Sequence, residues 1–312
     1  MTTESRGELF DIGYRRYDGP REGLWRARQT LWTNGIRTAL GIGRGMRAKI
    51  LPLLLLIGVV GPAVITVIIA SQSPEAARDA LSPPTYYHLV STFVMIFAAI
   101  VAPELICPDR RDRVLHLYLV RPIRPLDYIL SRWAAFFAVM LFFVYIGQII
   151  MFAGTLLASG DQWQYIKDYW LDVPKFMVAG LAIAAFYTTL SLAISSFTVR
   201  RAYASAFIVG VFIMGAASSG ILTGCDESSF DVPEGTPVNC VPITGENGKW
   251  FALLDVARAP THISNMVFDY EDESLTGIYV QDLPSAAPIG WYLLMVVVPG
   301  FILVRRYQRI SL

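Results

Sequence analysis

Six long segments without a single Asp, Glu, Lys or Arg constrain the fold of this chain more than any other feature of its sequence. They are Ile50–Ala70, Tyr86–Pro103, Trp133–Ala158, Phe176–Val199, Ala202–Thr223 and Ala286–Val304. A helix of about 20 apolar residues crosses the hydrocarbon core of a bilayer, which is about 30 Å thick. A water-soluble protein would place some of its charges, here 16% of the residues, on the outer face of every helix. We therefore predict an all-α integral membrane protein with six transmembrane helices.

The Lys and Arg residues lie mainly in alternate connections between these segments. Twenty-one of the 26 fall in the N-terminal segment, the loop 104–132, the turn at Arg200–Arg201 or the C-terminal tail. The remaining connections hold the other five, and the connection 224–285 alone holds eleven acidic residues. Connections rich in Lys and Arg stay on the cytoplasmic side of a membrane. We therefore expect a multi-pass protein of the plasma (inner) membrane with both termini in the cytoplasm.

The basic segment before the first span, residues 1–49, contains a stretch with helical periodicity at about 21–47. Its two faces differ in chemistry, because basic residues share one side and apolar residues gather on the other. The basic side holds Arg26, Arg37 and Arg44, and the apolar side includes Trp25 and Trp32. This pattern is typical of a helix that lies in the membrane interface, and we predict one here. A solvated basic arm is the alternative interpretation.

The connection 104–132 combines dense charge with a short apolar run. After Pro108 it contains, in order, Asp109, Arg110, Arg111, Asp112 and Arg113, then an apolar run with Leu117 and Tyr118, and then Arg121. Because proline is favoured in the first turn of a helix, we predict that a short helix begins after Pro108. We also predict that Asp127 caps the helix leading into the third span. Such a loop either docks a cytosolic partner or only fixes the orientation of the chain, and the residues alone leave both interpretations open.

This loop resembles the first cytoplasmic loop of type-2 ATP-binding-cassette (ABC) exporter permeases. In that family an acidic–basic helix leads into a Leu-Tyr-Leu-x-Arg-Pro-like turn and an Asp-Tyr-x-x-x-Lys/Arg entry to the third span. The matching residues are Asp109, Arg110, Arg111, Leu117, Tyr118, Leu119, Arg121, Pro122, Asp127, Tyr128 and Arg132. Many members carry a Gly-Thr pair after the charged residues, where this sequence has Val114-Leu115. The number of spans and the longer external loop before the last one agree with the same family.

The resemblance implies the domain organisation and the partners of such a permease. Residues 1–49 would be a cytoplasmic segment, 50–312 the six-span permease domain, 104–132 its coupling loop and 224–285 an external loop. Two cytosolic ABC ATPase subunits would bind ATP and Mg, and this chain would hold no cofactor and would not itself be an enzyme. A second copy of the chain or a related permease would complete the complex, in contact with membrane lipids. The coupling residues would be Asp109, Arg110, Arg111, Asp112, Arg113, Leu117, Tyr118 and Arg121.

The resemblance also implies that the protein moves a hydrophobic or amphiphilic substrate, lipid-like or drug-like, out across the plasma membrane. The second and fifth spans line the path in that family, which makes Phe207, Phe212 and Met214 candidate lining residues. Gln148 is a further candidate, although an interhelical hydrogen bond is the simpler interpretation. A non-transporting scaffold or sensor that anchors an ATPase would carry the same loop. An ion-coupled transporter fits poorly, because the spans lack the charged group that such coupling usually needs.

The cysteines and histidines predict one disulfide and no metal site. Cys225 and Cys240 lie in the external loop with 14 residues between them. A disulfide there would contribute about 3 kcal/mol, and two unpaired cysteines are the alternative. His88, His116 and His262 are too far apart in the predicted topology to share a metal ion. The sequence contains no GxxxxGK[ST] phosphate-binding loop, and we expect no nucleic-acid partner.

Overall fold

The computed structural model describes residues 23–73, 81–112, 123–224, 246–272 and 274–310 of the 312-residue chain. Six of the helices are long and apolar enough to cross a membrane. They are α2 (Met46–Gln72), α4 (Pro83–Arg111), α6 (Pro125–Ala158), α8 (Asp172–Ser195), α9 (Arg201–Leu222) and α12 (Ala286–Ile310). Within these described ranges no β-strand occurs, so the prediction of an all-α protein with six spans is confirmed.

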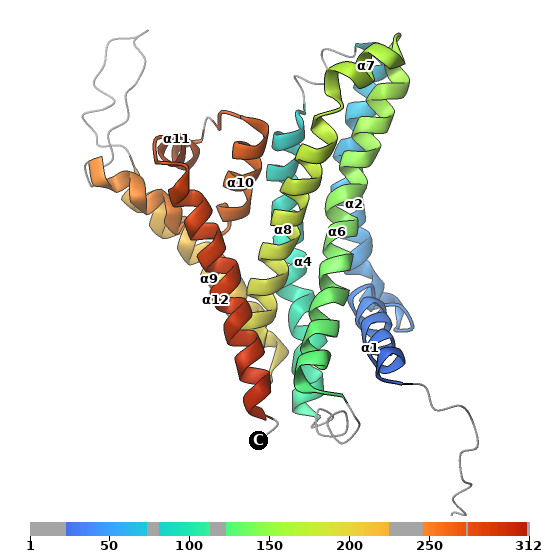
Figure 1. Cartoon of the computed structure of the whole chain (residues 1–312), viewed down its shortest axis with the longest axis vertical. Coiled ribbons are helices and arrows are strands. Elements are labelled where there is room, and N and C mark those ends of the chain that lie inside the picture. The colour runs from blue at the N-terminus through green and yellow to red at the C-terminus, as the bar shows by residue number, and fades with distance from the viewer. Residues whose placement is uncertain (1–22, 74–80, 113–122, 225–245, 273, 311–312) are drawn as a thin grey trace, which may run out of the picture.

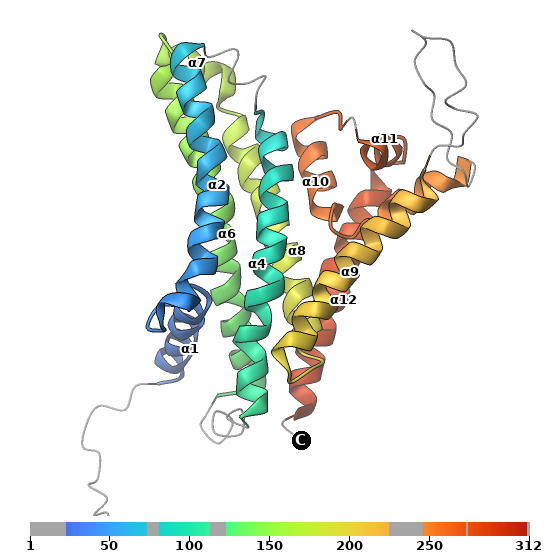
Figure 2. The same ribbon diagram turned by 180° about the vertical axis from the view of Figure 1, so that it is seen from behind.

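Helices α4 and α8 form the centre of the bundle (Figure 1). Helices α2 and α6 pack together on one side of this centre, and α9 and α12 lie on the other, as the reverse view also shows (Figure 2). The largest buried side chains of the core include Tyr86, Tyr87, Phe97, Phe136 and Phe186. Helices α9 and α12 lean away from α6, and most of their side chains are not buried.

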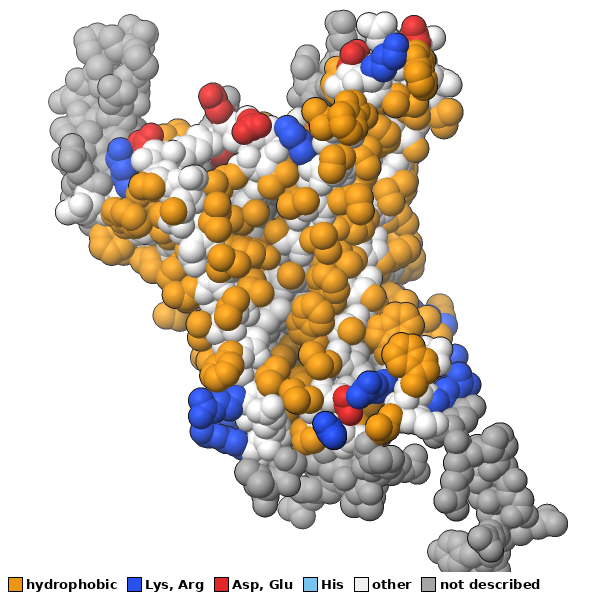
Figure 3. All heavy atoms as spheres, in the orientation of Figure 1, with side chains coloured by type: hydrophobic (Ala, Val, Ile, Leu, Met, Phe, Trp, Pro, Cys, Tyr) orange, Lys and Arg blue, Asp and Glu red, His pale blue; other side chains and the backbone are white. Residues whose placement is uncertain are grey.

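The two ends of the bundle differ in charge. Lys and Arg side chains gather at the end that holds α1 (Leu24–Ala39) and the C-terminus, whereas most of the Asp and Glu side chains visible in Figure 3 lie at the opposite end. We refer to these as the basic end and the acidic end. The shorter helices at the acidic end are α7 (Gln162–Tyr169), η2 (Glu246–Leu254), α10 (Ala259–Phe268) and α11 (Leu275–Gln281). Apolar side chains cover the flank between the ends, as a surface in contact with lipid requires.

The interfacial helix predicted over residues 21–47 is shorter in the structure. Helix α1 ends before Gly41 and Gly43, whose φ angles are 66° and 84°. Glycine adopts these left-handed angles without steric cost, so the chain turns here before α2 begins. Arg44 therefore lies in this turn and does not share a helix face with the two α1 arginines predicted beside it. The prediction of one continuous helix is wrong.

The helix predicted to begin after Pro108 does not begin there. Helix α4 continues through Pro103 and Pro108 to Arg111, which puts Asp109 in its last turn. Each proline removes one backbone hydrogen bond, but residues 105–107 are fully buried. Packing against the neighbouring helices outweighs the loss of these two hydrogen bonds. Helix α4 therefore continues past Pro103, where the predicted second span ends.

The fourth span ends earlier than the predicted Val199. Helix α8 stops at Ser195, and the hydroxyl of Ser196 donates to a carbonyl of the preceding turn at 2.6 Å. The carbonyl of Ser196 accepts hydrogen bonds from the side chains of Arg110 and Arg306. The two arginines thus satisfy a carbonyl at the end of α8 that has no partner within the helix.

Candidate functional site

The predicted site lies at the basic end, where residues 113–122 join α4 to α6. The carboxylate of Asp109, in the last turn of α4, accepts hydrogen bonds from Tyr128 and Arg132 of α6. The distances from Asp109 Oδ2 are 2.6 Å to the Tyr128 hydroxyl and 2.7 Å to Arg132 Nη2. The side chain of Arg132 is 3% exposed and that of Asp109 is 17% exposed. We refer to these three residues as the Asp109 cluster.

The Asp109 cluster contains an ion pair that is buried at Arg132 and partly buried at Asp109, and the ring of Tyr128 extends the cluster to a third helix. Each charge loses several kcal/mol of solvation on burial, which only a close partner offsets. The guanidinium of Arg132 lies over the ring of Tyr128, 5.6 Å from the centroid. The same ring stacks on Tyr307 of α12, with 5.8 Å between the ring centroids. Helices α4, α6 and α12 therefore meet at the base of the loop.

The end of α4 is also attached to the turn between α8 and α9. The side chains of Arg110, from α4, and Arg306, from α12, both donate to the carbonyl of Ser196. The thiol of Cys107 lies 3.5 Å from the carbonyl oxygen of Thr198. Carbonyls at the C-terminus of a helix carry partial negative charge, which favours nearby arginines. The α8–α9 turn, α4 and α12 are thus joined at the same level as the Asp109 cluster.

Helix α1 packs along the first half of α6. The buried stripe of α1 consists of Leu31, Gly35 and Ala39. A Cβ on Gly35 would lie 2.6 Å from the Cβ of Ala135, so the two helices approach too closely for any larger residue at this position. Arg28 of α1 forms an ion pair with Asp127 of α6 at 2.8 Å. These contacts hold α1 beside the Asp109 cluster.

Two further carboxylates connect α1 and its following turn to the other helices. Asp127 is the third residue of α6, where it accepts a hydrogen bond from the backbone N–H of Arg124 at 3.3 Å. Its carboxylate therefore accepts a backbone N–H that would otherwise be free at the start of α6. Asp127 lies inside the helix and is not the predicted N-cap residue, because α6 begins two residues earlier. Glu104 of α4 forms an ion pair with Arg44 at 2.9 Å and lies 3.9 Å from Arg201 of α9.

A comparison with protein families matches residues 44–311 to the family described as ABC-2 family transporter protein. The match includes all six long helices and the loop between α4 and α6. The chain belongs to the ABC-2 family. It is therefore a membrane permease of an ABC transporter, the component that partners with an ABC ATPase subunit. A comparison with curated proteins found no match.

The predicted coupling residues of this ABC-2 permease fall into two groups. Asp109, Arg110, Arg111 and Asp112 lie together at the end of α4, the last two exposed and paired at 3.0 Å. Arg113, Leu117, Tyr118 and Arg121 lie outside the described residues. The coupling role of both groups stays a prediction. The sequence motif included Tyr128 and Arg132. These residues follow Asp109 by 19 and 23 positions, and no pattern in the sequence predicts that they contact it.

The predicted interfacial residues of α1 lie on its outer surface. Trp25 and Trp32 are both exposed, and because they are seven residues apart they lie on the same side of the helix. Arg26 and Arg37 are also exposed. This arrangement suits a helix in the membrane interface, with the tryptophans at the level of the lipid headgroups.

The predicted path residues do not come together in the ABC-2 permease. Phe207 and Met214 are 63% and 73% exposed on one face of α9, whereas Phe212 is 1% exposed and packs on Tyr187 of α8. Phe212 is thus part of the core of this subunit. Gln148 is also buried, and its side-chain amide donates to the carbonyl of Pro83 at 2.9 Å. This bond joins α6 to α4, as expected if Gln148 forms an interhelical hydrogen bond and does not contact the substrate.

Sequence reasoning missed a polar cluster at the acidic end. His88 Nε2 of α4 lies 2.9 Å from Asn265 Oδ1 of α10, and 3.8 Å from the carboxylate of Asp272. The contact joins residues 177 positions apart, so no local pattern predicts it. No group of three or more candidate metal ligands occurs in the part of the chain that the structure describes. His116, Cys225 and Cys240 lie outside that part, and the disulfide stays a prediction.

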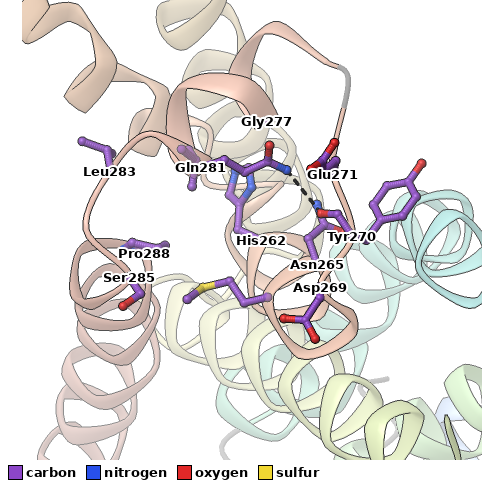
Figure 4. Close-up of a pocket in the computed structure, with 12 residues that line it drawn as sticks. His262, Asn265, Asp269, Tyr270, Glu271, Gly277, Gln281, Leu283, Ser285 and Pro288 are labelled. Atoms are coloured by element: carbon purple, nitrogen blue, oxygen red, sulfur yellow. Dashed lines mark hydrogen bonds between the residues drawn. The ribbon is translucent and has the colours of Figure 1, made fainter.

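Beside this polar cluster is a cavity of about 310 Å³, between α10, α11 and the start of α12 (Figure 4). His262 lines it and is 4% exposed. Burial lowers the pKa of His262 from 6.5 to about 4, since the neighbouring Asp272 offsets only part of the lost solvation. The imidazole is therefore neutral near pH 7. Within the lining of the cavity, the side-chain amide of Gln281 donates to the carbonyl of Tyr270 at 3.2 Å.

Proposed function

We propose that this chain is the permease subunit of an ABC exporter, energised by a separate cytosolic ATPase that docks at the basic end. The Asp109 cluster carries this proposal, because it links the last turn of α4 to the first turns of α6, the two helices that the loop 113–122 connects. In this proposal the protein lies in the plasma membrane, and its basic end and both termini face the cytoplasm. The excess of Lys and Arg at this end favours that orientation. Two permeases, identical or related, pair with two ATPase subunits that bind ATP and Mg.

The Asp109 cluster allows a force on the loop to reach several helices together. Removing one partner of a buried ion pair costs about 3–5 kcal/mol, so the contact resists separation and passes a force on the loop to α4 and α6 together. Helices α4 and α6 contain 29 and 34 residues, enough to cross the membrane and extend beyond it. Movement at the basic end therefore reaches the acidic end. Arg110 and Arg306 carry the same movement to the α8–α9 turn and α12.

We propose a hydrophobic or amphiphilic substrate, lipid-like or drug-like, that moves outward. The charged residues of the six spans lie within eight residues of a helix end, which leaves the middle of each span uncharged. Phe207 and Met214 add an apolar, exposed face to α9. Transport of a simple ion would need charged or strongly polar groups near the middle of the membrane. The spans favour a substrate that is itself largely apolar.

The test begins with the association between the permease and its ATPase. We expect an ATPase subunit to co-purify with the wild-type chain, and Arg111→Glu to reduce its recovery about tenfold. Arg111 is exposed beside the loop, and reversing its charge disturbs docking without disturbing the core. Arg26→Glu is the matched control, because it reverses an exposed charge on α1, away from the loop. Equal recovery with both variants would contradict docking at this loop.

Reconstitution then separates an exporter from a scaffold. In liposomes, the complex is expected to move a hydrophobic fluorescent probe when ATP is present and to stop when ATP is withheld. A complex that hydrolyses ATP and moves no probe would support the alternative of a scaffold or sensor subunit that anchors an ATPase.

We also propose that Cys225 and Cys240 form a disulfide in the external loop. A membrane-impermeant maleimide added to intact cells should label these cysteines only after reduction. Labelling without a reducing agent would contradict the disulfide. Absence of labelling after reduction would contradict an external position for this loop.

A further inference from the structure

A cavity of about 400 Å³ opens at the basic end between α1, the turn that follows it, α4 and α6. Seven of its ten lining residues are polar or charged, which distinguishes it from the apolar flank beside it. Arg37 and Thr38 line it from α1 and Arg44 from the turn, while Glu104 and Arg132 line it from the longer helices.

Arg132 lines this cavity, and its buried guanidinium is not fully hydrogen-bonded by the described residues. Its Nη2 binds Asp109, but its Nε and Nη1 have no hydrogen-bond partner among the described residues. A Cβ on Gly35 would lie 3.9 Å from Nη1, so this nitrogen lies toward α1, where Asn34 and Thr38 line the cavity. A guanidinium that is 3% exposed and lacks some of its hydrogen bonds lowers the stability of the fold unless an acceptor binds it.

Among the described residues, the charges that line the cavity leave one cation, Arg37, without an ion-pair partner. Glu104 is paired with Arg44 at 2.9 Å, and Asp109 with Arg132 at 2.7 Å. Arg37 forms no ion pair in the described part of the chain, so the cavity has an excess of one positive charge. Guanidinium groups bind phosphate oxygens through paired, charge-assisted hydrogen bonds. We infer that this cavity binds a phosphate group, with Arg37 and Arg132 as the residues that recognise it.

The surroundings favour the phosphate of a phospholipid headgroup over a soluble phosphate. Ile42 lines the cavity and is exposed, and two residues after Arg44 the chain enters α2, whose Met46 and Ile50 are also exposed. A lipid whose phosphate lies in the cavity would therefore extend its acyl chains along α2. The inference goes beyond the proposed function and does not depend on ATPase docking.

Native mass spectrometry of the purified full chain in detergent tests this inference with three probes. They are dioleoylphosphatidylglycerol, dioleoylglycerol, which has the same acyl chains without phosphate, and inorganic phosphate. Arg37→Gln removes the cation of the cavity that forms no ion pair with the described residues. Arg26→Gln is the matched control, since Arg26 lies eleven residues earlier on the same face of α1 and does not line the cavity. Thermal unfolding of each variant verifies that it is folded.

We expect dioleoylphosphatidylglycerol to bind more tightly than dioleoylglycerol, and Arg37→Gln to weaken its binding about tenfold. Arg26→Gln should change the binding less than twofold. Binding of inorganic phosphate that depends on Arg37, without preference for the phospholipid, would assign the same site to a soluble phosphate. Equal binding of both lipids without any binding of phosphate would overturn the inference, and so would equal losses in the two variants.

Discussion

Replacing Asp109 by Asn removes one charge from the Asp109 cluster and changes its shape very little. The new side chain still accepts a hydrogen bond from Tyr128, but the guanidinium of Arg132, 3% exposed, loses its carboxylate. Removing one partner of a buried pair costs about 3–5 kcal/mol. Because the side chain of Asp109 is 17% exposed, water screens part of the attraction, and we expect the lower value, about 3 kcal/mol of unfolding free energy.

Asp112→Asn is the matched control for this substitution. It makes the same chemical change three residues later, at a side chain that is 51% exposed and pairs with its neighbour Arg111. Exposed pairs of this kind contribute about 0–1 kcal/mol. A third variant, Asp109→Asn with Arg132→Met, removes both charges. It should recover at least about 1 kcal/mol of the loss, because no unpaired charge then stays buried.

Reversible unfolding in mixed detergent micelles, followed by tryptophan fluorescence and circular dichroism, measures all three variants. The expected order of stability is Asp112→Asn, close to the wild type, then the double variant, then Asp109→Asn. If Asp109→Asn and Asp112→Asn unfold within about 0.5 kcal/mol of each other, Arg132 does not depend on Asp109. The reasoning about the cluster would then be refuted.

Three further substitutions test other contacts. Gly35→Val should cost about 1–3 kcal/mol in the same unfolding assay, because its side chain would collide with Ala135, and an unchanged stability would contradict the close approach of α1 and α6. Gln148→Leu should lose about 1 kcal/mol with the hydrogen bond to Pro83 and leave probe transport within twofold, whereas a transport defect with unchanged stability would indicate substrate contact. The pKa of His262 is lower in the folded chain, about 4 against 6.5, so its contribution to stability is complete above pH 6.5 and decreases by up to about 3 kcal/mol as the pH falls to 4. Unfolding measured across this range should lose that dependence in His262→Gln, and an unchanged pH profile would show that His262 is not its source.

The spans could be predicted from the sequence because one local property, the absence of charge over about 20 residues, decides them. The ends of the helices depend on tertiary contacts and were harder to predict. Pro108 has the local character of a helix start, but burial of residues 105–107 extends α4 past it. The sequence pattern predicts one helix over 21–47, but Gly41 and Gly43 adopt left-handed φ angles and form a turn that ends α1 earlier.

The candidate site divides in the same way. The motif indicated the loop after α4 and its charged residues, because their types and order are local features of the sequence. Which of these residues is buried depends on tertiary contacts and not on the local sequence. Asp109 forms an ion pair with Arg132, whereas Asp112, three residues later, is exposed. Phe212 and Phe207 look alike in the sequence, and only the packing of α9 on α8 separates a core residue from an exposed one. The contact between His88 and Asn265 spans 177 positions and depends on the fold as a whole.

The ratio of probe molecules transported to ATP hydrolysed, measured in proteoliposomes, tests most directly whether the Asp109 cluster conveys the work of the ATPase to the spans. Asp109→Asn should still bind the ATPase and hydrolyse ATP, and its transport per ATP should fall about tenfold, because the weakened cluster no longer holds α4 to α6. Asp269→Asn, which removes an exposed carboxylate at the acidic end, should keep the wild-type ratio. A wild-type ratio in Asp109→Asn, with the ATPase bound and active, would contradict a role for the cluster in coupling.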